Sequence, residues 1–116
     1  MNRGQFFDQS GRLIIEDMLR ATNAWERARG LLGRALQKNQ GLWIEPCSSV
    51  HTIGMGYHLD LVYLDSGSVI VKTVEHLAPW RISGCRRAHS TLELTAGFVR
   101  AQGLTKGMQL DWVDSP

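Results

Sequence analysis

The segment from Pro46 to Gly56 concentrates side chains that can do chemistry: a thiol, three hydroxyls, an imidazole and a thioether. A thiol in contact with an imidazole loses its proton more readily and becomes a nucleophile, and the same pair supplies two soft metal ligands. Cys47 and His51 are therefore candidate catalytic residues, and Thr52 and Met55 are candidate ligand-binding residues beside them. The structural alternative is a buried thiol next to a histidine that bonds to the backbone. The other histidines and Cys85 show no regular ligand spacing, so we expect no metal and no cofactor.

A second candidate segment runs from Pro79 to His89 and contains an indole and three guanidinium groups: Trp80, Arg81, Arg86 and Arg87. Guanidinium groups recognise phosphate or carboxylate through paired donors, and a neighbouring indole can stack on a ring. The sequence therefore predicts ligand-binding roles for these four residues. The alternative is that the arginines pair with Asp60, Glu75 or Glu93 and only fix the loop. Three arginines are too few to predict nucleic-acid binding, which needs several phosphate contacts.

Asp60 interrupts the otherwise apolar run from Leu59 to Leu64. A carboxylate in such a run either lies on the solvated face or is buried with a partner, because isolated burial costs too much. With Arg86 or His51 as its partner, it would join the two candidate segments. We therefore include Asp60 among the candidate ligand-binding residues.

The charge is unevenly distributed along the 116 residues, although the net charge is only +2. Residues 1–40 carry seven bases and four acids, residues 41–79 one base and four acids, and residues 80–116 five bases and three acids. This balance excludes a strongly basic nucleic-acid coat and an acidic solvating tail. The length and the 43% of apolar residues predict a single domain over residues 1–116 with a buried core.

Targeting signals are not evident in this sequence. No stretch approaches the roughly 18–20 consecutive apolar residues that span a bilayer, and the first residues lack the apolar core of a signal peptide. We therefore expect a cytoplasmic protein that does not bind a membrane. Its two cysteines, Cys47 and Cys85, are too few for a disulfide scaffold. In the cytosol we expect both as thiols, and the alternative is an internal bridge between them.

The apolar pattern predicts both strands and helices. We expect a first strand over residues 11–18, a short strand over 42–44, and a hairpin of 59–64 and 69–74 joined by a turn at 65–68. Further strands are predicted over 91–94 and 108–112. Helical spacing predicts one helix from Ala24 to Leu36, and a second from Ala96 to Gln102 capped by Thr95. The expected fold is α+β: a small, β-rich, barrel-like antiparallel or mixed sheet with two helices packed at one side.

Several separated motifs occur in one order: Arg27 to Arg34, Gly41 to Ile44, Cys47 to Met55, Leu59 to Asp65, Leu92 to Gly97, and Gly103-Leu104 before Gly107. With these motifs the chain resembles the bacterial and archaeal domain of unknown function 192 family over about residues 12–113. The resemblance implies a compact, β-rich α+β domain and brings no established activity. Met108 and Thr95 stand where many members have Asp and Pro, so a mechanism that uses an acid at position 108 is excluded.

Two functions follow from these residues. The first is a non-catalytic ligand-binding or partner-binding accessory protein, with a polar crevice between residues 47–55 and 80–89 that accepts a small anionic molecule or an acidic protein segment. The alternative is a thiol-dependent enzyme that uses Cys47 as the nucleophile and His51 as the base.

Overall fold

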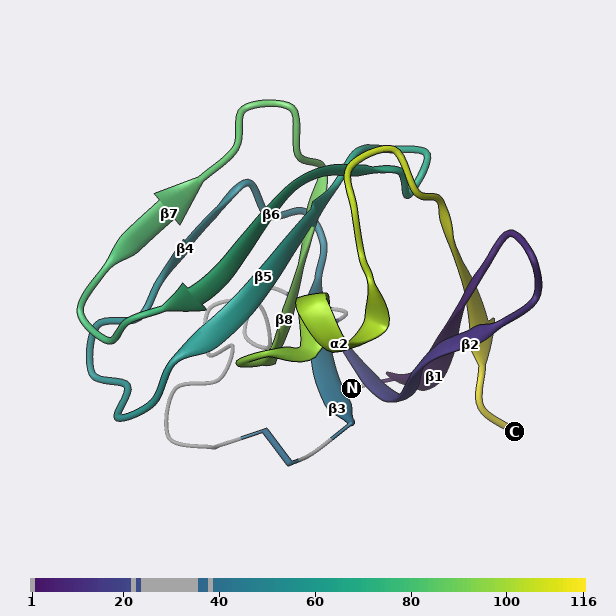
Figure 1. Ribbon diagram of the computed structural model, residues 1–116, viewed down its shortest axis with the longest axis horizontal. Helices are drawn as coiled ribbons and strands as arrows, with labels where there is room; N and C mark the ends of the chain where they lie inside the picture. Colours follow the sequence, from purple (N-terminus) through teal and green to yellow (C-terminus); the bar gives the residue numbers. More distant parts are fainter. Residues whose placement is uncertain (1, 22, 24–35, 38) are drawn as a thin grey trace.

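A computed structural model describes residues 2–21, 23, 36–37 and 39–116 of the chain (Figure 1). Most of these residues lie in strands, and the elements, with the labels of Figure 1, are β1 (Asn2–Asp8), β2 (Leu13–Ala21), β3 (Gln40–Ile44), β4 (Ser49–His51), β5 (Leu59–Leu64), β6 (Ile70–Leu77), β7 (Ile82–Gly84), β8 (Ser90–Thr95), α2 (Phe98–Gln102) and β9 (Leu110–Asp114). Seven strands form one sheet in the order β6-β5-β8-β3-β2-β1-β9, and β4 pairs with β7 in a separate two-stranded sheet.

The predicted hairpin is confirmed as β5 and β6, which pair antiparallel. Its turn forms where expected, because the Asp65 carboxylate accepts the backbone N–H groups of Gly67 and Val69 at 2.9 and 3.0 Å. Neighbouring strands of the large sheet are antiparallel except β2 and β3, which run parallel. The sheet is therefore mixed, and it places β8 in its interior between β3 and β5.

The prediction of a barrel-like sheet is wrong, because the seven-stranded sheet is open between β6 and β9. These edge strands meet at one corner only, through a bridge between Val69 and Gln109. Three backbone hydrogen bonds hold that corner, including Ile70 N–H to the Met108 carbonyl at 2.8 Å. Closure of a barrel requires continuous pairing along both edges, which this short contact does not supply.

The prediction of two helices at one side is also corrected, because the described residues contain a single short helix, α2. The helix predicted from Ala24 to Leu36 lies, apart from Leu36, outside the described residues. α2 begins at Phe98, and its N-cap is Gly97, without a side-chain cap from Thr95. The fold is therefore mostly β, and only the β-rich part of the predicted α+β class holds.

The two faces of the sheet bury separate hydrophobic clusters. α2 lies over the first face, where the largest cluster includes Phe6, Ile15, Trp43, Leu92 and Phe98. On the opposite face one cluster forms around Leu42 and Leu59, and another around Leu61 and Tyr63. Alternation along β8 explains this division, because Leu92 and Leu94 point to the first face and Glu93, which lies between them, to the second.

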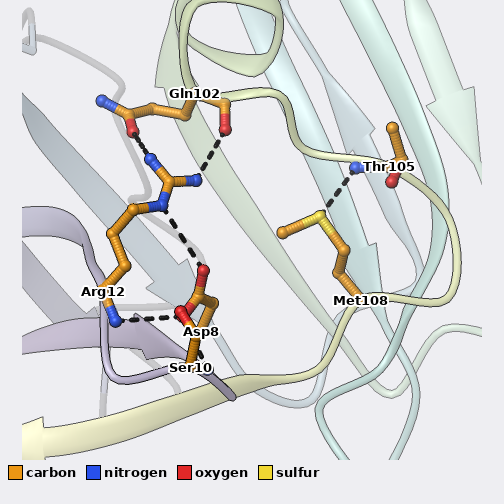
Figure 2. A network of polar contacts seen from close by, with 6 residues as sticks. All are labelled: Asp8, Ser10, Arg12, Gln102, Thr105 and Met108. Carbon is orange, nitrogen blue, oxygen red and sulfur yellow. Dashed lines mark hydrogen bonds and ion pairs between the residues drawn. The ribbon is translucent and has the colours of Figure 1, made fainter.

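A polar network ties the β1–β2 turn to the end of α2 (Figure 2). Asp8 accepts the Ser10 hydroxyl and the backbone N–H of Arg12, and these contacts lower its pKa below the usual value. The Arg12 guanidinium then donates to the side-chain and backbone oxygens of Gln102 at 3.2 and 3.1 Å. The network thus connects strands at one end of the sheet with the helix that covers its first face.

Gly4 allows β1 to approach β9 closely, which gives a first testable prediction. A Cβ atom at this position would lie 2.6 Å from the Val113 carbonyl oxygen and would overlap the Trp112 indole. We expect Gly4→Ala to lower the free energy of unfolding by about 2 kcal/mol, as overpacking does. Urea unfolding measures the effect, with Gly56→Ala as the control because a Cβ there meets nothing within 4 Å. A loss no larger than that of the control would contradict the packing.

Candidate functional site

The two candidate segments of the sequence lie side by side as the strands β4 and β7. His51 is opposite Ile82 and Val50 is opposite Ser83 in an antiparallel register. We call these strands and the residues that flank them, 46–53 and 79–89, the β4–β7 ribbon. It occupies one end of the molecule, away from β1, β2 and β9 (Figure 1). Direct pairing means that the segments form one two-stranded surface rather than the two walls of a crevice.

Thr52 fixes the end of the ribbon and is fully buried. Its hydroxyl donates to the Ala78 carbonyl at 2.7 Å and accepts the Arg81 backbone N–H at 2.9 Å. Its backbone carbonyl accepts the N–H groups of Met55 and Trp80 at 3.1 and 3.0 Å. The predicted ligand-binding residue Thr52 therefore holds the backbone of residues 78–81 in place.

The ribbon is also attached to the main sheet. Val50 packs with Leu61 and Tyr63, and the Tyr63 hydroxyl donates to Ser83 at 2.8 Å. The Lys72 ammonium donates to the Gly84 carbonyl at 2.8 Å. Burial raises the pKa of Tyr63, and its hydrogen bond to Ser83 partly offsets this rise. These contacts occupy the inner face of the ribbon and leave the side chains of the outer face exposed.

Three large apolar side chains of the ribbon are exposed. Ile82 is 76% exposed, Trp80 65% and Ile53 43%. The backbone at Trp80 is left-handed, with φ 62°, a conformation that costs a bulky residue about 1–3 kcal/mol. The hydrogen bond from its N–H to Thr52 holds it there. Such an exposed cluster is typical of a binding surface, because single soluble domains rarely leave grouped apolar side chains in water.

The ribbon also contains three exposed arginines: Arg81, which precedes β7, and Arg86 and Arg87, which follow it. No described carboxylate forms an ion pair with any of them, so the predicted pairing with Asp60, Glu75 or Glu93 is not seen. The ribbon contains no Asp or Glu. The ribbon therefore combines exposed aromatic and aliphatic side chains with arginines that no described acid pairs.

Cys47 and His51 are not linked by a hydrogen bond that the structure describes. The Cys47 thiol donates to the Ser49 carbonyl at 3.1 Å, and the side chain of Cys47 packs on the inner face beside Val50 and Tyr63. His51 is exposed on β4, opposite Ile82. Both cysteines are free thiols. This geometry shows no base positioned against the thiol, as nucleophilic catalysis would require.

Asp60 lies inside the protein and contacts neither Arg86 nor His51 through any described hydrogen bond or ion pair. One carboxylate oxygen accepts the His76 N–H at 2.9 Å, and the other accepts the N–H groups of Gly97 and Val99 at 3.1 and 2.9 Å. Gly97 is the N-cap of α2 and Val99 lies in its first turn, so the carboxylate sits at the helix end whose free N–H groups favour an acceptor. The carboxylate therefore has three backbone partners that join β5, β6 and α2.

Glu93 is a buried acid that was considered in the sequence only as a partner for arginine. It lies at the centre of β8, is 3% exposed, and its Oε2 atom has no hydrogen-bond partner in the described structure. Burial raises its pKa from 4.5 to about 7. The alternating pattern of β8 could not reveal that Glu93 is buried, because an acid between apolar residues usually marks a solvated face. The second face of β8 is covered here by residues distant in the sequence.

Met55 and Tyr57 are half-buried, and both pack against the cluster around Leu42 and Leu59. Burial raises the pKa of Tyr57, and the negative charge of Glu93 raises it further. Met55, a predicted ligand-binding residue, therefore packs against the apolar cluster around Leu42 and Leu59.

Other surface features contain none of the predicted site residues. A shallow groove of about 330 Å³ lies between β6 and α2, lined by Thr73, Glu75, Val99, Arg100, Gly103, Leu104, Thr105 and Lys106. Among the described residues there is no group of three or more His, Cys, Asp or Glu side chains placed to hold a metal ion. No helix in that part of the chain is long and apolar enough to cross a membrane.

Comparison with known proteins identifies relatives by sequence and by fold. The sequence model of the domain of unknown function 192 family, described as "Uncharacterized ACR", matches residues 7–112. No curated protein matches the chain. A similar structure comes from Sinorhizobium meliloti 1021 and is described as a "putative transcription regulator"; it has a TM-score of 0.79 and 23% identity, with 96% of this chain and 92% of that chain covered.

A second similar structure is a protein of unknown function from Novosphingobium aromaticivorans DSM 12444. It has a TM-score of 0.75 and 18% identity over 95% of this chain and 84% of that chain. At these identities the likeness establishes a shared fold and assigns no site.

Proposed function

Because the chain belongs to the domain of unknown function 192 family, whose description names no activity, we propose a function from its own surface. In this proposal the protein is a non-catalytic binding module, and it holds an acidic segment of a partner protein against the outer face of the β4–β7 ribbon. One observation carries the proposal: the ribbon contains three exposed large apolar side chains and three exposed arginines, and no acid.

The positive charge of the ribbon favours an acidic partner. Arg81, Arg86 and Arg87 are fully charged at neutral pH, and their planar guanidinium groups bind carboxylates through two parallel hydrogen bonds. Trp80 and Ile82 between them supply the apolar contact that exposed ion pairs alone do not. An extended peptide in which acidic residues alternate with large apolar residues matches both requirements. A bare small anion would leave the apolar side chains in water.

Hydrogen bonds fix the backbone of the ribbon before a partner binds. Its backbone is fixed by Thr52, by Tyr63 through Ser83, and by Lys72 through Gly84. A rigid surface loses little conformational entropy on binding, and this preserves affinity for a small interface. Arg86 and Arg87 follow β7 directly, so their charge lies next to this fixed part of the chain.

The proposal is tested with a fluorescein-labelled peptide of alternating Glu and Leu, whose binding is followed by anisotropy. We expect binding that weakens with added salt, and a loss of about ten-fold or more in affinity for Trp80→Ala and for the double variant Arg86→Ala/Arg87→Ala. Lys106→Ala removes an exposed positive charge outside the ribbon and serves as the matched control, with unchanged affinity expected.

Three results would refute the proposal. The first is equal affinity for a peptide of alternating Lys and Leu, which would remove the charge argument. The second is full affinity in the double arginine variant. The third is binding to vesicles that contain phosphatidylserine without binding to the acidic peptide, which would assign the ribbon to a lipid surface instead.

A further inference from the structure

The hydrogen bonds between β4 and β7 fix the direction in which each backbone group of β7 points. At the two ends of β7, the Arg81 carbonyl and the Cys85 N–H both bond to the residues that flank β4, each at 2.9 Å. In an antiparallel pair, the backbone groups of successive residues point alternately toward the partner strand and away from it. The N–H and C=O groups of Ile82 and Gly84 therefore point away from β4, along what we call the outer edge of β7.

Contacts of Gly84 agree with this direction and show that the edge is accessible. Its carbonyl accepts the Lys72 ammonium at 2.8 Å, and Lys72 lies on β6 rather than β4. Gly84 is exposed, and because glycine has no side chain this exposure is that of the backbone. Among the described residues, a Cβ atom at Gly84 would come within 4 Å of Ser48 and Ser49 only, both on the β4 side. β7 lies at the periphery of the molecule (Figure 1).

An exposed edge strand is a template on which another chain can pair. Its outward N–H and C=O groups supply the affinity, and exposed side chains beside them supply the specificity. In the part of the chain that the structure describes, β7 pairs with β4 alone, and Ile82 on β7 is 76% exposed. The outer edge of β7 thus offers both backbone groups and an apolar contact to an added strand.

The positive charge near β7 determines which strand can be added. Arg81 precedes β7, and Arg86 and Arg87 follow it. A second copy of this chain would bring the same arginines against one another, and like charges on adjacent strands are destabilising. A strand with acidic side chains brings carboxylates to these guanidinium groups instead. The ammonium group of Lys72, at the Gly84 carbonyl, adds positive charge at the same edge.

We propose that the acidic segment of the partner binds as a third strand of the ribbon, along the outer edge of β7. Its backbone pairs with the N–H and C=O groups of Ile82 and with the N–H of Gly84. Every second side chain of the segment then lies on the face that carries Ile82. The inference rests on the proposed function and adds the class of partner: a segment that is free to become a strand, and not a helix.

The test uses the labelled Glu–Leu peptide in three forms: unmodified, N-methylated at every Glu, and N-methylated at every Leu. In an added strand only the amides of alternate residues face β7. We therefore expect one methylated form to lose about ten-fold or more in affinity, and the other to bind like the unmodified peptide. Equal affinities for the two methylated forms would overturn the inference, because side-chain contacts alone do not distinguish the two sets of amides.

Two variants test the same edge from the side of the protein. Gly84→Pro removes the outward N–H and places a ring at the edge, and it should weaken peptide binding about ten-fold or more. Gly84→Ala is the matched control, because it keeps the N–H and its Cβ meets the described residues at 3.5 Å or more. Circular dichroism checks that both variants are folded. Equal peptide affinities of the two folded variants would contradict pairing at this edge.

Amide hydrogen exchange locates the contact in the wild type. Bound peptide should slow exchange at Ile82 and Gly84, whereas the Cys85 N–H, which bonds to Ser48, is protected in both states. Unchanged exchange at Ile82 and Gly84 with the peptide bound would overturn the third strand and leave the proposed function standing. Protection without peptide that rises with protein concentration would assign the edge to a second copy and overturn the inference. If the unmodified peptide does not bind, both proposals fail.

Discussion

Replacing Asp60 with alanine is expected to lower the free energy of unfolding by about 3–5 kcal/mol, the largest loss predicted for a single side chain here. The substitution leaves three backbone N–H groups without their acceptor: those of His76, Gly97 and Val99. Each is a donor to a charged group, and the surroundings of Asp60 exclude water because its side chain is fully buried. Urea unfolding followed by circular dichroism measures the loss.

Two further variants make the Asp60 prediction specific. Asp60→Asn keeps the shape but offers one acceptor oxygen in place of two, so we expect it to retain only part of the lost stability. Asp111→Ala removes an exposed acid and is expected to change stability by less than about 0.5 kcal/mol. A loss below about 1 kcal/mol for Asp60→Ala would show that the three hydrogen bonds do not support the junction of β5, β6 and α2.

Glu93→Gln is expected to stabilise the protein at alkaline pH and to remove most of its pH dependence near neutrality. The folded-state pKa of Glu93, about 7, lies above its value of 4.5 in the absence of burial. The folded state therefore holds the proton more tightly, and stability is greatest below the unfolded-state pKa and falls as pH rises through 7. Between about pH 5 and about pH 8 the wild type should lose about 2–3 kcal/mol.

Urea midpoints at the two pH values check this prediction. In Glu93→Gln the midpoints should nearly coincide, because glutamine does not ionise. Asp8 is the other described carboxylic acid with a shifted pKa, and its pKa is lowered. The stability that Asp8 contributes is therefore lost only at acidic pH. Glu75→Gln should keep the wild-type dependence. A wild type whose stability does not fall over this range would contradict the burial of an unpaired carboxyl.

Local sequence patterns correctly predict those elements that are held by contacts between residues close together in the chain. The turn at residues 65–68 was predicted from Asp65 and Gly67, and the structure shows the Asp65 carboxylate on the expected amides. The family resemblance drawn from separated motifs is confirmed over residues 7–112. β1 was not predicted, because its pattern is mostly polar and only Phe6 points into the main core. Its partners are β2 and the distant β9.

The features that the sequence does not predict correctly depend on contacts between residues far apart in the chain. Thr95 has the residue type of a helix cap, yet the cap of α2 comes from Asp60, 37 residues from Gly97. The predicted juxtaposition of residues 47–55 and 80–89 occurs, but as paired strands, since β-pairing satisfies backbone groups that a crevice would leave open. The local sequence pattern does not indicate that Glu93 is buried. Its burial arises only in the folded sheet, where Glu93 lies opposite Leu42 and Leu61 of the neighbouring strands.

The pairing of β1 with β9 has a consequence for synthesis of the protein. Gly4 lies opposite Asp114, so the first and last strands of the chain are neighbours in the sheet. During translation, β1 therefore has no second partner until β9 has been synthesised, and the edge of β1 that pairs with β9 stays exposed until then. The same adjacency brings the two ends of the fold together, an arrangement in which proteins tolerate circular permutation well.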